Sequence, residues 1–175
     1  MSVNEELSEG VEHAKEPFEK KVAVSMAIIA SALAIVSVLG HIFGNEELLA
    51  QQKASDQWAY YQAKAIRRYD SEIARDLAKV LDSAKAPAPV EKYEKNLDRY
   101  EKEGDEIQEE AKKLEAESKL RGQQALRLHI GEVFLEIGIV FASLAILTKR
   151  PIVFSTAIVS ALIGVGIALT TLMVK

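Results

Sequence analysis

Two carboxylates and two imidazoles lie within or beside long apolar stretches of this sequence. Glu132 follows His129 by one helical turn and Glu136 follows Glu132 by another, so the three side chains would share one helix face. His41 closes an earlier apolar stretch. An ionised carboxylate inside an apolar layer is costly, so such groups face protein or water, bind a proton, or pair with another residue.

This cluster has three interpretations. It could form a proton or cation path, a metal site of imidazole nitrogens and carboxylate oxygens, or a structural polar cluster. The metal interpretation is weak, because His-x-x-Glu-x-x-x-Glu reverses the Glu-x-x-His order of di-iron bundles, which draw ligands from four helices. We favour the structural interpretation, and we expect no metal, no cofactor and no catalytic residue.

Three apolar stretches position these groups: residues 22–43, 128–148 and 152–174. At about 1.5 Å per residue, each is long enough to cross a hydrocarbon core of about 30 Å. We therefore expect three transmembrane helices in a multi-pass protein of the bacterial inner membrane. The short basic connection at 149–151 favours a cytoplasmic amino terminus.

The predicted spans carry small residues at four-residue spacing, which allow helices to approach closely in lipid. We therefore expect a tight bundle and a homo-oligomer. The rows are Ala23, Ala27 and Ser31; Ala30 and Ala34; Gly138 and Ala142; Ser160, Gly164 and Ala168.

Residues 45–127 form a charged segment of helical periodicity, with 18 acidic and 16 basic residues. Two prolines at 86–89 interrupt it, since proline disfavours helix at the preceding residue but fits the first turn of a following helix. The predicted fold is all-α: three transmembrane helices and, between the first two, a long antiparallel helical hairpin of coiled-coil type. Residues 1–21 are an acidic tail that is either an amphipathic helix or disordered.

Heptad spacing in both arms predicts the register of the hairpin. The expected layers, whose residue numbers sum to about 173, bring apolar side chains together, with Asp70 opposite Gly104. They are Val80 with Tyr93, Leu77 with Leu97, Ile73 with Tyr100, Ile66 with Ile107, Ala63 with Ala111, and Ala59 with Leu114.

Trp58, Tyr60 and Tyr61 form a cluster of aromatic residues in the first arm. On a helix continuing from residue 43 they would stand about 22 Å beyond the bilayer edge, too far for an interfacial aromatic belt. We expect them to pack within the hairpin or between copies of the chain. The alternative is a contact with another protein.

Composition narrows the function further. The net charge of −4 comes without a polybasic patch, so nucleic acid is not an expected partner. The absence of cysteine excludes disulfides, thiolate nucleophiles and zinc–thiolate sites. Hydrolase, phosphate-loop, dinucleotide and zinc-protease motifs are also missing, so we do not expect an enzyme.

The segment SDQWAYYQAK at residues 55–64, shortly after an apolar stretch ending SVLGHIFGNEELLAQQ, resembles an uncharacterised family of bacterial membrane proteins grouped as a domain of unknown function. The resemblance implies one anchor, a charged helical region and two closing spans, and it transfers no catalytic residue. We expect a non-enzymatic, homo-oligomeric membrane scaffold that docks through its hairpin. The alternatives are a channel-like or transporter-like subunit for protons or cations, and an accessory subunit bound to another membrane protein.

Overall fold

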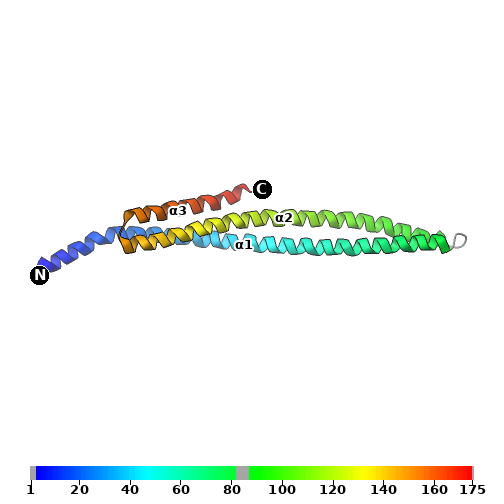
Figure 1. Cartoon of the computed structure of the whole chain (residues 1–175), viewed down its shortest axis with the longest axis horizontal. Helices are drawn as coiled ribbons and strands as arrows, with labels where there is room; N and C mark the ends of the chain where they lie inside the picture. Colours follow the sequence, from blue (N-terminus) through cyan, green and yellow to red (C-terminus); the bar gives the residue numbers. More distant parts are fainter. Residues whose placement is uncertain (1–2, 82–86, 175) are drawn as a thin grey trace. The chain divides into compact units, whose positions relative to one another are not determined.

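The computed structural model describes residues 3–81 and 87–174, which form three α-helices and a terminal 3-10 turn (Figure 1). Helix α1 is Val3–Leu81, α2 is Pro87–Thr148, α3 is Pro151–Leu169, and η1 is Thr170–Met173. No strand occurs in these two ranges. The predicted all-α class is therefore confirmed.

The chain divides into two compact units. The apolar unit is Met1–Gly44 with Arg121–Lys175, and the hairpin unit is Asn45–Leu120. Helices α1 and α2 contribute to both units, and α3 belongs to the apolar unit. The division falls close to the predicted change from apolar spans to charged hairpin.

Two segments predicted as a tail and a turn are partly helical in the structure. Of the predicted tail, the part from Val3 onward belongs to α1, which includes Pro17, while residues 1–2 lie outside the described residues. Of the predicted turn at 86–89, Ala86 also lies outside them, and α2 begins at Pro87. Proline suits this position because the first turn of a helix needs no N–H from it.

Small residues hold α2 and α3 together in the apolar unit. A Cβ atom on Gly131 would lie 2.8 Å from the carbonyl oxygen of Gly164, and one on Gly164 would lie 2.7 Å from that of Gly131. The buried hydroxyl of Ser160 donates a hydrogen bond of 2.7 Å to the carbonyl of Phe134. The small-residue rows of these two helices therefore allow the close packing expected from the sequence.

A tight connection joins α2 to α3. Lys149 has a φ of 55°, and its N–H donates to the carbonyl of Ala145 at 2.9 Å, a left-handed end typical of helix C-termini. Pro151 then occupies the first turn of α3. Two apolar clusters fill the interior of the unit, one around Leu135 and one around Val22.

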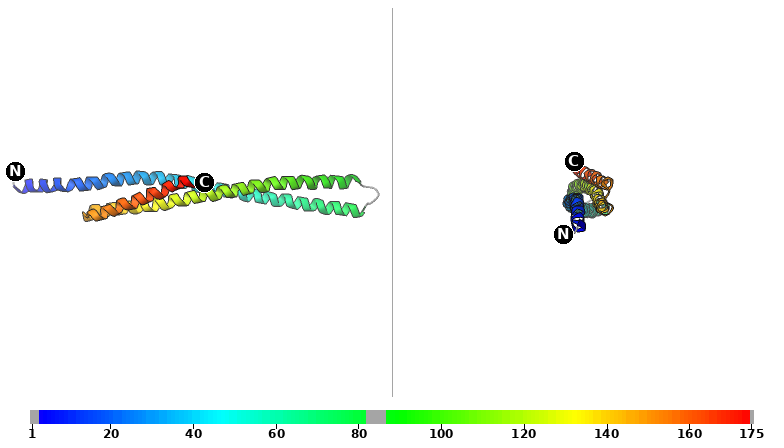
Figure 2. Two further views of the ribbon diagram at one scale, coloured as in Figure 1. Left: turned by 90° about the horizontal axis from the view of Figure 1, so that it is seen from above. Right: turned by 90° about the vertical axis from the view of Figure 1, so that its left-hand side faces the viewer.

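In the hairpin unit, α1 and α2 run antiparallel (Figures 1 and 2). The predicted contact row of α2 is confirmed: its residues are all buried or half-buried. They are Tyr93, Leu97, Tyr100, Gly104, Ile107, Ala111 and Leu114.

The predicted contact row of α1 is wrong. Ile66, Ile73, Leu77 and Val80 are 61%, 67%, 55% and 80% exposed, and Ala59, Ala63 and Asp70 are exposed as well. A different heptad row of α1 faces α2, namely Ala50, Ala54, Gln57, Tyr61, Lys64, Arg68, Ser71, Arg75 and Ala78. The two rows are offset by two residues, or about 200° around the helix.

The residue opposite Gly104 differs accordingly. A Cβ atom on Gly104 would lie 3.6 Å from the ring of Tyr61, so Tyr61 and not Asp70 is opposite this glycine. Ser118 donates a hydrogen bond of 3.2 Å to the carbonyl of Glu47. These two pairs have residue numbers that sum to 165, and Lys64 with Glu103 sums to 167. The contacts of Trp58 with Glu115 and of Lys79 with Glu94, made by long side chains, sum to 173.

Candidate functional site

Three of the four predicted polar residues meet in the apolar unit. The rings of His41 on α1 and His129 on α2 lie edge to face, with centroids 6.0 Å apart. The Nδ1 atom of His129 is 3.1 Å from Oε2 of Glu132. Ser37 lies next to Glu132 and interacts with its carboxylate. The cluster thus links two helices through imidazole, carboxylate and hydroxyl groups.

Gly40 makes room for this arrangement. A Cβ atom at position 40 would lie 3.2 Å from Cε1 of His129. That distance is tighter than ordinary van der Waals contact, so a larger residue would push the imidazole away. The sequence Gly40-His41 therefore brings one imidazole to the contact and leaves space for the other.

Glu136 does not join the other three. It is exposed on α2, and among the described residues it has no hydrogen-bond or ion-pair partner. Its neighbours on that face, Val133 and Val140, are also exposed. The carboxylate thus lies in an otherwise apolar surface.

Within residues 3–81 and 87–174, no three His, Cys, Asp or Glu side chains are grouped so that they could hold a metal ion. His41, His129 and Glu132 form a connected cluster. Within it, Nδ1 of His129 and Oε2 of Glu132 are hydrogen-bonded to each other, so these two atoms are not directed at a metal ion.

The aromatic cluster divides between two surfaces of the hairpin unit. The Trp58 and Tyr61 rings lie edge to face with centroids 5.7 Å apart, and Nε1 of Trp58 donates a 2.7 Å hydrogen bond to Glu115 on α2. Tyr60 is half exposed, and the centre of its ring lies 5.2 Å from Nζ of Lys64. Trp58 and Tyr61 therefore pack within the hairpin, and Tyr60 lies beside the Lys64 side chain with half of its surface exposed.

An ion pair between Lys64 and Glu103 joins the two arms, and sequence patterns did not reveal it. The Lys64 side chain is only 13% exposed, and its Nζ lies 5.6 Å from the centre of the Tyr100 ring. Its hydrogen bond to Glu103 raises the pKa of Lys64, and the same bond lowers the pKa of the Glu103 carboxyl. A charged residue thus occupies an inner position of the hairpin, where apolar residues are usual.

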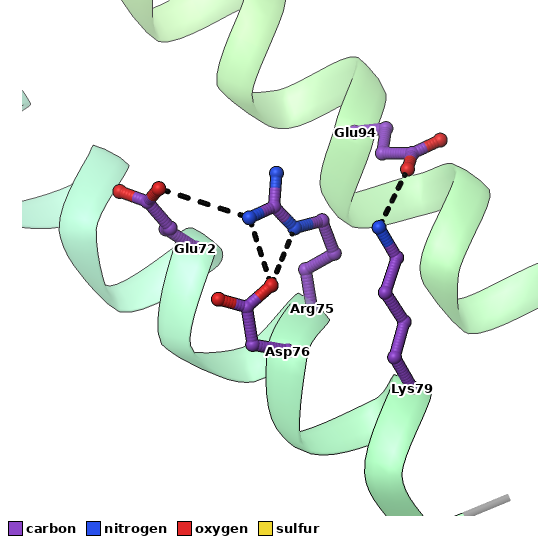
Figure 3. A network of polar contacts seen from close by, with 5 residues as sticks. All are labelled: Glu72, Arg75, Asp76, Lys79 and Glu94. Atoms are coloured by element: carbon purple, nitrogen blue, oxygen red, sulfur yellow. Dashed lines mark hydrogen bonds and ion pairs between the residues drawn. The ribbon is translucent and has the colours of Figure 1, made fainter.

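A second charged network lies nearer the tip of the hairpin (Figure 3). Arg75 pairs with Asp76 at 2.8 Å and with Glu72 at 3.7 Å, both on its own helix. Lys79 reaches across to Glu94 on α2 at 3.2 Å. Such exposed pairs contribute little stability each, and of these three the pair of Lys79 with Glu94 joins the two arms.

The surface left on the other side of α1 is the most conspicuous feature of the hairpin unit. It consists of a heptad row, which we call the outer stripe, formed by Ala59, Ala63, Ile66, Asp70, Ile73, Leu77 and Val80. All seven residues are exposed. Six of them are apolar, and Asp70 lies in the middle.

These features define a class of protein: an all-helical chain with three helices long and apolar enough to cross a membrane, joined to a charged helical hairpin. The chain belongs to the DUF4337 family, a domain of unknown function whose match extends over residues 18–174. The predicted membership of an uncharacterised domain family is thereby confirmed. Neither the curated proteins nor the solved structures contain a match to the chain.

Proposed function

We propose that the chain is a three-span protein of the bacterial inner membrane that acts as a non-enzymatic, homo-oligomeric scaffold, with the hairpin unit as its docking element. The spans are residues 22–43, 128–148 and 152–174. The exposed surface of the apolar unit supports this, because large aliphatic side chains cover it on all three helices. Lipid is the natural environment for an apolar surface of this extent.

The observation that carries the homo-oligomer is the position of Glu136. It lies about 12 Å along the helix from the start of its span, on an outward face. A charged side chain near the centre of a bilayer costs about 3 kcal/mol on insertion scales, and intramembrane acids usually face protein or water. A neighbouring copy of the chain shields the Glu136 carboxylate from lipid.

Small residues on α1 fit the same arrangement. Ala23, Ala27, Ala30 and Ala34 are exposed in the apolar unit, unlike the small residues of α2 and α3 that are buried between those helices. Rows of this kind let helices of separate chains approach closely in lipid. The outer surface of α1 is therefore suited to a contact with another copy.

The effect of Glu136 on assembly tests the proposal. In the full chain extracted into mild detergent, Glu136→Leu should shift the mass measured by light scattering toward the monomer. The reason is that a leucine at this position can face lipid or detergent without the cost of a charged group. Ile163→Leu, at an exposed position of α3, serves as the control and should leave the mass unchanged. A monomeric wild-type protein would refute the homo-oligomer.

A second candidate function is the movement of protons or cations. The observation that favours it is the series of ionisable groups along one end of the apolar unit, where His41, His129 and Glu132 are in contact and Glu136 follows one turn later. Such series occur along proton and ion pathways.

A flux assay separates the two functions. The channel-like function predicts that purified protein in liposomes dissipates a pH or cation gradient and that Glu136→Gln and Glu132→Gln reduce the rate. The scaffold function predicts no flux above that of empty liposomes. A flux that both variants leave unchanged would exclude these carboxylates as its path.

A further inference from the structure

We infer that the outer stripe is the contact surface for a second copy of the chain, with two α1 helices pairing in parallel as a coiled coil. This inference rests on the proposed function, in which copies lie side by side in one membrane. It names the occupant of a surface that the fold leaves open.

The spacing of the stripe indicates what kind of partner covers it. Residues 59, 63, 66, 70, 73, 77 and 80 alternate by four and three, the repeat that keeps a row of side chains facing one neighbouring helix. The row extends over about 30 Å of helix. A surface of this periodicity fits another helix running alongside it.

The partner helix cannot be α2 of the same chain. The opposite face of α1 is already packed on α2, through contacts such as Tyr61 with Gly104 and Lys64 with Glu103. The two heptad rows of α1 therefore have separate roles, one within the chain and one outside it.

The α2 helix of another copy is also a poor partner. Between residues 90 and 120, α2 exposes no large apolar side chain, and its outward positions are mostly Glu, Lys, Asp and Arg. The outer stripe of a second copy, by contrast, offers the same apolar row. The contact is therefore self-complementary, as in two-fold symmetric dimers.

Parallel pairing is compatible with the flanks of the stripe. In a parallel coiled coil, Gln62 of one helix would face Arg67 of the other, and Tyr69 would face Ala74, so these flanks bring no like charges together. Exposed Tyr60 and Tyr69 lie beside the stripe and extend the contact area. Copies inserted in the same membrane orientation present their stripes in this parallel sense.

Asp70 makes the central layer of the pair costly. The two Asp70 side chains would face each other there, with Arg67 one turn earlier on each helix. Facing carboxylates repel each other, so this layer lowers the stability of the pair and depends on Arg67 to balance its charge. Asp70→Leu should therefore strengthen the association.

Cysteine crosslinking tests the inference in the full chain, which has no native cysteine. In isolated membranes under mild oxidation, Ile66→Cys and Ile73→Cys should each form disulfide-linked dimers. The control is Glu109→Cys, an exposed position on α2. Dimer yield at the stripe should exceed the control by about tenfold, because a disulfide needs Cβ atoms only about 4 Å apart.

Each other outcome contradicts part of the inference. Dimers that form only when Ile66→Cys and Ile73→Cys chains are mixed would indicate antiparallel pairing and overturn the parallel arrangement. No stripe dimers in a protein that still has an oligomeric mass would overturn the inference and leave the proposed function standing. A monomeric mass would overturn both.

Discussion

At the scale of single residues, the hairpin depends on charged side chains in positions where apolar ones are usual. Lys64 is the main example: its aliphatic stem is buried, its ammonium group lies near Tyr100, and it donates to Glu103. Long cationic side chains cover apolar surface in this way while their charge is satisfied at the tip. The contact between the arms therefore combines burial with a specific ion pair.

This ion pair predicts how hairpin stability depends on pH. The pKa of Glu103 is lowered in the folded chain, so its stabilisation is present above its ordinary value near 4.5 and is lost as the pH falls through the lowered pKa. The pKa of Lys64 is raised, so its stabilisation is present below about 10.5 and is lost as the pH rises through the raised pKa. Thermal unfolding followed by the fluorescence of Trp58, the single tryptophan, should show both losses.

Glu103→Gln should flatten the acid side of that profile and lower the midpoint at pH 7. Glu109→Gln, on an exposed position of the same helix, is the control and should change neither. An unaltered acid limb in Glu103→Gln would mean that this pair does not stabilise the hairpin.

At the scale of helices, the glycine contact between α2 and α3 makes a sharp prediction. Gly164→Ala would place a Cβ atom 2.7 Å from the carbonyl oxygen of Gly131, so the helices must separate, at a cost of about 1–3 kcal/mol. Gly166→Ala, in the same helix, meets nothing within 4 Å and should be neutral or slightly stabilising. Unfolding in detergent by denaturant measures both, and equal effects would contradict the close approach of these helices.

The hairpin gives a second prediction at this scale, from one buried position on α2 and one exposed position on α1. Ile107 is buried in the contact between the arms, so Ile107→Ala should lower the free energy of unfolding by about 2–4 kcal/mol. Ile66→Ala, on the exposed outer stripe, should cost less within a single chain and should act mainly on association. Trp58 fluorescence during denaturant unfolding compares them. A larger loss for Ile66→Ala at low protein concentration would restore the contact row of α1 predicted from sequence.

The two contact rows show where sequence reasoning succeeded and where it did not. Heptad spacing located the contact row of α2 correctly, because its apolar residues are the ones that are buried. On α1 the same procedure selected Ile66 and Ile73, since an apolar count favours the more apolar of two heptad rows. The row actually used contains Ala54, Ser71 and Lys64, whose packing depends on small size and on a paired charge.

The polar cluster shows a similar division. Spacing alone placed His129 and Glu132 on one helix face, and their hydrogen bond follows from that. The contact of His41 with His129 depends on the packing of α1 on α2, for which Gly40 provides the space. The outward direction of Glu136 also depends on where neighbouring helices lie, which spacing along one helix does not specify.

At the scale of the whole molecule, the proposed membrane insertion predicts the sides on which residues become accessible. With the amino terminus in the cytoplasm, Arg150→Cys should react with a membrane-impermeant thiol reagent only after the inner membrane is opened. Glu109→Cys in the hairpin should react in intact spheroplasts. The reverse pattern would indicate the opposite topology. Reaction of both cysteines from the same side would contradict an odd number of spans between positions 109 and 150.

The central claim is that copies of the chain associate within the membrane and that Glu136 lies at the contact between them. A cryo-EM map of the full chain in lipid nanodiscs tests this most directly, because it gives both the number of copies and the direction of the Glu136 side chain. We predict more than one copy of the 19.3 kDa chain, with Glu136 at a contact between copies. A single copy per disc with Glu136 facing lipid would contradict it.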